Sequence, residues 1–350
     1  MRGLRTTMLI GGLLAIVLLA VQRWQGEGEP PSDADDPIVQ PVGPAVTVWT
    51  RGGPTRLSAA ADTASGAAPR ASGDSDAGAI AVGDDVIPGE YILRFYDEQD
   101  RRTFEAIARE LGVQILDTMR VGHAVRIRVK NPGLLRELLK KSPTPTDWMP
   151  NTYVSVPERG DNAPLPPERG YQAFGSQTLA WLGISDNASW GNGITVGVLD
   201  TGIAAATSLR GINIEHVDLV GEAGGTAAHG TAVASLIAGR EGAVRGIAPG
   251  VDLLSLKVMS DSGLGDTFTL AKGIIDAVDR GVNVINFSLG SRGDSAILRE
   301  AVRYAVSRGV VLVAAAGNDA VRGVLYPARY DEVIAVAAVD AAGRHLYFSN

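Results

Sequence analysis

The sequence contains no cysteine and only four histidines, and these two scarcities exclude several kinds of chemistry. Without cysteine there is no disulfide, no thiolate nucleophile and no zinc site with cysteine ligands. The histidines are scattered along the chain, so a metal site built from several imidazoles is not expected; they are His123, His216, His229 and His345. The chain also lacks a basic run, and its formal charge of −7 argues against nucleic acid as a partner.

Long apolar runs are equally scarce, and the one at the N-terminus predicts a targeting segment over residues 1–24. Arg2 and Arg5 precede an unbroken apolar run over residues 8–21. Fourteen residues suit the core of a signal peptide better than a full membrane span, which needs roughly 20. A cleaved signal peptide and an uncleaved anchor both remain open, and residues 8–21 are the candidate contact with a membrane. Either reading predicts export, with the protein secreted or anchored at the cell envelope.

The rest of the chain is long enough for two folded units. Residues 25–85 are rich in Pro, Gly, Ala, Ser and Asp, with Trp49 as the single aromatic residue, and predict a disordered linker. Residues 86–157 predict the order β-α-β-β-α-β, typical of a small α+β ferredoxin-like sandwich. A second linker is predicted over 158–174.

Residues 175–350 alternate between strands and helices. The expected strands 194–200, 251–259, 282–290, 310–318 and 333–339 are apolar on both faces. Such strands belong in a parallel sheet flanked by helices on both sides. This α/β class places functional residues at the carboxyl ends of its strands.

Polar or glycine residues stand at the carboxyl ends of three of these strands. Asp200 ends the first, Asn318 ends the fourth, and Ser288, Leu289 and Gly290 end the third. His229 begins the expected helix 229–239, 29 residues after Asp200. The sequence therefore predicts that an acid, an imidazole and a carboxamide meet at one edge of the sheet.

Two protease chemistries use an aspartate in a setting like VLDTG. An aspartic protease needs two carboxylates that share a proton, and the sequence has no second Asp-Thr-Gly or Asp-Ser-Gly. In the other chemistry a buried carboxylate orients a histidine, which takes a proton from a serine. A side-chain amide such as that of Asn318 suits the developing oxyanion.

These residues resemble the subtilisin-like serine proteases. VLDTGI is similar to the aspartate motif of that family, HGTAVASLIAG to its histidine motif, NFSLG to its cleft strand and AAAGN to its oxyanion motif; GIAPG and YPA also match, in order. The resemblance implies that Asp200 orients His229, that His229 is the general base and then acid, and that Asn318 binds the oxyanion. Ser288, Leu289 and Gly290 would bind an extended polypeptide substrate.

The same resemblance implies that residues 86–157 are a propeptide. Such a unit templates the folding of the protease and then occupies its cleft, with cleavage somewhere after Val156. It would be an intramolecular partner of the catalytic part. The resemblance implies no organic cofactor; calcium is common in the family, but the sequence indicates no ligand set.

The family's nucleophile is not found among the 350 residues. After Asn318 the single serine is Ser349, in YFSN, which is similar to an element that precedes the nucleophile of the family. We therefore expect a C-terminally incomplete catalytic domain that is inactive by itself. A peptide-binding protein without catalysis, and a protease inhibitor or foldase built on residues 86–157, are the alternatives.

Overall fold

The computed structural model describes residues 46–50, 53–57, 85–157, 178–182, 187–222, 225–241 and 245–350. The predicted targeting segment 1–24, the linker 158–174 and most of the linker 25–85 lie outside these residues. Within 25–85 the structure contains an antiparallel hairpin of β1 (Val46–Thr50) and β2 (Gly53–Leu57), which the sequence analysis did not predict. In the described part of the chain, no helix is long and apolar enough to cross a membrane.

The C-terminal unit is built on a six-stranded sheet in which every pairing is parallel, with the order β13-β12-β11-β7-β9-β8. The strands are β7 (Thr195–Asp200), β8 (Ile214–Asp218), β9 (Asp252–Lys257), β11 (Val284–Phe287), β12 (Val311–Ala315) and β13 (Ile334–Val336). The expected parallel sheet flanked by helices is confirmed. The strand β8 was not predicted, because Glu215, His216 and Asp218 are polar and exposed at the edge of the sheet.

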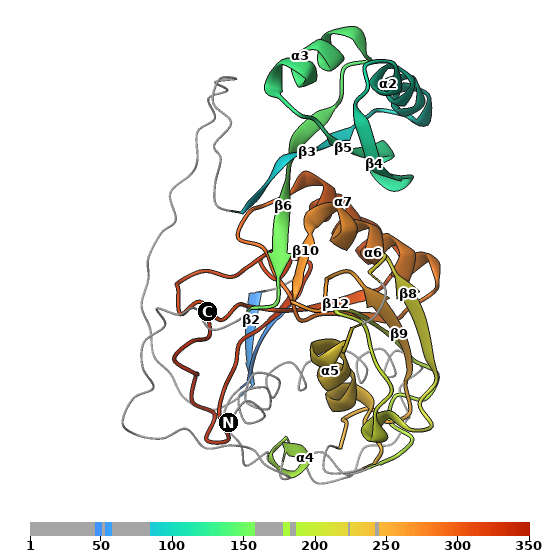
Figure 1. The fold of residues 1–350 in the computed structure, drawn as a ribbon. Helices are drawn as coiled ribbons and strands as arrows, with labels where there is room; N and C mark the ends of the chain where they lie inside the picture. The colour runs from blue at the N-terminus through green and yellow to red at the C-terminus, as the bar shows by residue number, and fades with distance from the viewer. Residues whose placement is uncertain are drawn as a thin grey trace, which may run out of the picture.

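Helices cover both faces of this sheet (Figure 1). Alternate residues of β7 point to opposite faces, so Val196 and Val198 pack in the cluster that contains α5 (Ala228–Ala238). Leu199 packs in the opposite cluster, which contains α6 (Thr267–Asp279) and α7 (Ala296–Ser307). A short helix, α4 (Thr178–Trp181), precedes β7 in the chain.

Residues 86–155 form a second sheet with the helices on one face. The elements are β3 (Val86–Arg94), α2 (Glu98–Glu110), β4 (Gln114–Met119), β5 (Ala124–Arg128), α3 (Pro132–Lys141) and β6 (Asp147–Ser155). The sheet is antiparallel, in the order β10-β6-β3-β5-β4, and its fifth strand, β10 (Leu264–Asp266), comes from the C-terminal unit. The ferredoxin-like assignment stays a prediction.

The two faces of this second sheet are buried by different partners. Leu93 and Ile127 pack on one face against Phe104 of α2 and Leu138 of α3. On the other face Ile92, Met119, Ala124 and Val154 join the cluster of α6 and α7. The α+β unit is therefore docked on the two helices through an apolar surface (Figure 1).

Phe268 of α6 has no exposed surface and belongs to this shared core. We expect Phe268→Ala to lower the free energy of unfolding by about 3–5 kcal/mol, because it removes buried apolar area and leaves a cavity. Urea unfolding of the full chain measures the change. Val321→Ala is the control: Val321 is 52% exposed, so its loss changes stability by about 0.5 kcal/mol or less. Equal effects of the two substitutions would contradict the shared core.

Candidate active site

Asp200 lies at the carboxyl end of β7, between β11 and β9, and is completely buried. Its Oδ1 accepts a hydrogen bond of 2.7 Å from the backbone N–H of Thr201. A buried carboxylate is stable only where donors satisfy it. The carboxylate is thus held in one orientation by the backbone that follows its own strand.

His229 is the second residue of α5, and its ring meets this carboxylate. Its Nδ1 lies 2.8 Å from Oδ1 and 2.9 Å from Oδ2 of Asp200. An ionised carboxylate only accepts hydrogen bonds, so this pairing requires a proton on Nδ1, and in a neutral imidazole the acceptor is then Nε2. The structure brings these two predicted residues together in the geometry of a carboxylate that orients a base.

Gly230 permits this approach. A Cβ atom at this position would lie 2.1 Å from the carbonyl oxygen of Gly202 and 3.1 Å from the Cβ of Asp200. The N–H of Gly230 donates to Oγ1 of Thr201 at 3.1 Å. Any side chain at 230 would push α5 away from the end of β7. The glycine of the HGT motif is therefore required for steric reasons.

The start of α5 is held from outside the helix. The residue before it, Ala227, has φ 43° and no side-chain cap. The carboxylate of Asp261 accepts from the backbone N–H groups of Thr226 and Ala227, and Lys257 donates to it at 3.2 Å. The Lys257 ammonium, together with these amides, holds the pKa of Asp261 below its usual value. The sequence analysis missed this residue, because only the fold brings 261 to 226.

Asn318 follows β12 by three residues and is 6% exposed. Gly317, with φ 119°, turns the backbone into a conformation that favours glycine. The Nδ2 of Asn318 donates a hydrogen bond of 2.5 Å to the carbonyl oxygen of Pro157. A side-chain amide donor is therefore already bonded to a peptide carbonyl of the chain itself.

The three residues predicted for the cleft have different surroundings. Ser288 lines one pocket with His229, Asn318 and Pro157. The Ser288 hydroxyl accepts from Nδ2 of Asn286 at 3.1 Å. Leu289 is fully buried in the core of α6 and α7, whereas Gly290 exchanges two backbone hydrogen bonds with Ser155. Of the three, Gly290 makes the backbone contact expected of a cleft residue.

The end of β6 and the two residues after it, segment 153–157, lie between two walls. On one side β6 pairs antiparallel with β10, and the N–H of Val156 donates to the carbonyl of Gly263 at 3.0 Å. On the other side Ser155 pairs with Gly290. The wall formed by 263–266 was not predicted, because a three-residue strand of mixed polarity gives no periodic signal.

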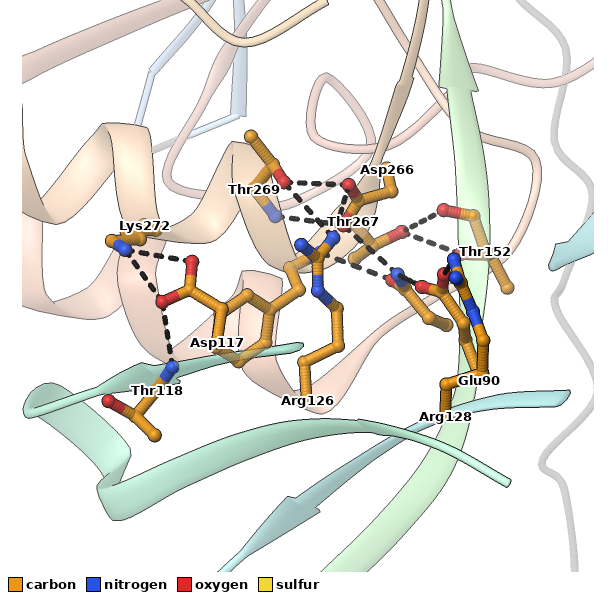
Figure 2. Close-up of polar contacts among 12 residues, drawn as sticks. Glu90, Asp117, Thr118, Arg126, Arg128, Thr152, Asp266, Thr267, Thr269 and Lys272 are labelled. Carbon is orange, nitrogen blue, oxygen red and sulfur yellow. Dashed lines mark hydrogen bonds and ion pairs between the residues drawn. The ribbon is translucent and has the colours of Figure 1, made fainter. Parts of the chain in front are cut away.

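A polar network fixes β6 against the start of α6 (Figure 2). The buried Asn151 donates to Glu90 at 2.9 Å and to Asp266 at 3.0 Å, and its Oδ1 accepts from the N–H of Phe268 at 3.3 Å. Arg126 donates to Asp266 at 2.7 Å. The hydroxyls of Thr152 in β6 and Thr267 in α6 lie 2.6 Å apart. Lys272 of the same helix donates to Asp117 of β4 at 2.8 Å. The contacts of Asn151 and Thr152, which both belong to β6, set the register in which this strand enters the cleft.

No group of three or more histidine or acidic side chains in the described part of the chain could hold a metal ion. None of the other three histidines lines the pocket of His229.

The bond between His229 and Asp200 predicts a proton NMR signature in the full chain. We expect the Nδ1–H proton of His229 to resonate at low field and to move upfield in Asp200→Asn, since a neutral acceptor replaces a charged one. Spectra of ¹⁵N-histidine-labelled protein measure this, and four histidines keep them simple. His345 serves as the internal control. A low-field signal that is unchanged in Asp200→Asn would contradict the pairing.

Known proteins are similar to the part of the chain that contains this site. The model of the Subtilase family matches residues 191–350. The chain is 40% identical over 193 residues to a thermostable alkaline protease of Halalkalibacterium halodurans, covering 52% of this chain and 53% of the relative. It is 41% identical over 169 residues to subtilisin DY of Bacillus licheniformis, covering 46% of this chain and 61% of the relative. The chain thus spans less than two thirds of these curated relatives.

The crystal structure of fervidolysin from Fervidobacterium pennivorans, described as a keratinolytic enzyme related to subtilisin, shares the fold with a TM-score of 0.56 at 22% identity. The match covers 71% of this chain and 42% of that one. The family model and the sequence identities agree that the C-terminal part of the chain, residues 191–350, is similar to the Subtilase family.

Proposed function

We propose that the protein is a subtilisin-like serine endopeptidase precursor in which Asp200, His229 and Asn318 are the orienting acid, the general base and the oxyanion donor. One observation carries the proposal. The Nδ2 of Asn318 is bonded to a peptide carbonyl, that of Pro157, in the pocket lined by His229, whose ring is held by the buried Asp200. Its substrates are polypeptides.

The geometry supports acyl transfer in two steps, acylation of a serine and hydrolysis of the acyl-enzyme. A serine hydroxyl attacks the carbonyl carbon, its proton passes to Nε2 of His229, and the charge that develops on the carbonyl oxygen is bound by Asn318. His229 then gives the proton to the leaving amine, and the peptide C–N bond breaks. Water repeats the sequence on the acyl-enzyme, which restores the hydroxyl.

We infer that this hydroxyl comes from outside residues 1–350. Among the described serines, Ser288 lines the pocket, but its hydroxyl accepts from Asn286. The hydroxyl of Ser349 accepts from the N–H of Ala338 at 2.9 Å and is 5% exposed. Neither serine stands in the Gly-Thr-Ser context of the family's nucleophile, and we propose that the 350 residues alone lack peptidase activity.

We further propose that residues 86–157 inhibit this site in the same chain. Their apolar sheet face is buried on α6 and α7, and their last three residues fill the cleft with hydrogen bonds to Gly290, Gly263 and Asn318. This binding mode is that of a substrate whose final carbonyl is Pro157. Cleavage between Pro157 and Glu158 would convert the precursor into the mature enzyme. We also propose that residues 1–24 direct export.

Peptidase activity is expected from the gene product expressed with the coding sequence that follows codon 350. His229→Ala should lower kcat/KM by at least about 10⁴-fold, since the general base is lost. Asn318→Ala should lower kcat by about 10²–10³-fold with little change in KM, because the oxyanion forms only in the transition state. Hydrolysis of a chromogenic peptide measures both values.

A fluorophosphonate probe provides the matching control, because it should label a serine outside residues 1–350. Labelling inside this range would contradict the assignment of the nucleophile. A product that binds peptides in the cleft without hydrolysing them would favour the non-catalytic alternative.

Inhibition by the α+β unit is expected to depend on its last three residues. A fragment 86–157 added to the mature enzyme should inhibit, and a fragment 86–154 should bind about 10²–10³-fold more weakly. The shorter fragment loses four hydrogen bonds to the cleft, each contributing about 1 kcal/mol. Tyr96→Ala, at a side chain that is 82% exposed, is the neutral control. Equal inhibition by both fragments would contradict the substrate-like binding mode.

A further inference from the structure

Asn318 belongs to a short loop, residues 317–321, that contains two backbone conformations of positive φ. Gly317 has φ 119°, and Ala320 has φ 56°. A residue other than glycine is uncommon in this region, and it persists only where the surrounding structure holds it there. The position of the Asn318 amide therefore depends on the contacts that fix this loop.

Asn350 provides three of these contacts. Its Oδ1 accepts from the backbone N–H of Asp319 at 2.9 Å and from that of Val321 at 3.3 Å. Its own N–H donates to the carbonyl oxygen of Gly317 at 3.0 Å. One residue thus binds the loop on both sides of position 318.

The segment 348–350 is itself anchored to the chain that follows β13. The hydroxyl of Ser349 accepts from the N–H of Ala338 at 2.9 Å, and the Phe348 side chain packs in the same cluster as Ala338. The carbonyl of Phe348 accepts from the N–H of Ala320 at 2.9 Å. The loop is therefore fixed relative to the sheet, and its residue with φ 56° is held by a direct hydrogen bond.

The Asn350 side chain has one orientation in this place. Two N–H groups point at its Oδ1, whereas its Nδ2 is buried and has no hydrogen-bond partner among the residues that the structure describes. A Cβ atom built on Gly317 would lie 2.4 Å from this Nδ2. The oxygen therefore holds the loop, and the nitrogen packs against the glycine.

We propose that Asn350 is a positioning residue for oxyanion binding, which holds loop 317–321 so that Nδ2 of Asn318 points at the carbonyl before the scissile bond. This inference rests on the proposed function, in which Asn318 is the oxyanion donor. Asn350 does not line the pocket of His229, so it acts through Asn318. A donor stabilises the developing charge only where its distance and direction fit, and a small displacement weakens it.

The first part of the test uses the full chain of 350 residues and needs no catalysis. The Asn318 Nδ2–H proton is bonded to the carbonyl of Pro157, and ¹⁵N-asparagine labelling makes it observable by NMR. Asn318→Ala identifies the signal by removing it. Asn350→Ala should move this proton upfield and speed hydrogen exchange of the Asp319 and Val321 amides at least about tenfold, since two hydrogen bonds are lost.

Asn350→Asp is the matched control, because it keeps an oxygen acceptor and lacks only the nitrogen that has no partner. It should preserve the Asn318 signal, with exchange within about threefold of the unmodified chain. If thermal melting shows that Asn350→Ala does not fold, Asn350→Leu replaces it, since leucine has a similar shape and no acceptor.

The second part measures kcat and KM in the gene product expressed with the coding sequence that follows codon 350. Asn350→Ala should lower kcat at least about tenfold with KM changed less than about twofold, and Asn350→Asp should restore kcat to within about threefold. In the Asn318→Ala background, Asn350→Ala should lower kcat by less than about twofold more, because the donor that it positions is already gone. A merely structural role would lower kcat equally in both backgrounds.

Three results would overturn the proposal. They are an unchanged Asn318 signal in Asn350→Ala, an equal loss of that signal in Asn350→Asp, and an equal fall in kcat with and without Asn318. The NMR measurement is independent of hydrolysis. An absence of peptidase activity together with the expected NMR shift would therefore reject the proposed function and leave the hold of Asn350 on Asn318 standing.

Discussion

The close approach of helix α5 to the end of strand β7 is the constraint on which the rest of the site depends. It requires a residue without a side chain at Gly230, where a Cβ atom would lie 2.1 Å from a backbone carbonyl. With that approach, Asp200 remains buried yet hydrogen-bonded, and the imidazole of His229 is held by both carboxylate oxygens. Without it, the carboxylate would lose the imidazole and keep the N–H of Thr201 as a donor, and a buried carboxylate with too few donors is strongly disfavoured. The pairing of Asp200 with His229 and the packing of α5 on β7 therefore both require glycine at position 230.

A second constraint is that one strand, β6, has two roles. It belongs to the sheet that is docked on α6 and α7, and its end lies in the cleft. The α+β unit buries an apolar sheet face on α6 and α7, and β6 leaves that contact to pair with β10 and Gly290. The polar network around Asn151 allows one register of β6, because its amide and carbonyl groups are all bonded without exposure to water. Since side chains alternate along a strand, a slip of one residue would turn Val154 out of the shared core and remove the carbonyl of Pro157 from Asn318.

The sheet and the residues at its edge were predictable because each follows from local pattern. Strands apolar on both faces indicate a parallel sheet, and polar residues after them must meet at its carboxyl edge. The elements that escaped prediction are short or polar: β8 is an exposed edge strand, and β10 has three residues. Asp261 holds the start of α5 and Asn151 joins β6 to the start of α6, and each is a single polar residue without a periodic signal around it. Their roles arise from contacts between residues distant in sequence, which periodicity does not encode.

By itself the sequence determined the class of fold, the order of its elements and the types of group that carry the chemistry, because hydrophobic period and motif spacing are properties of the chain. Only the tertiary structure decided that Asn318 is bonded to the carbonyl of Pro157 and that residues 155–157 lie between two walls. The physical reason is that these contacts join separate units of the chain. Their geometry is set by the burial of whole faces against one another, and no local pattern specifies which surfaces will meet.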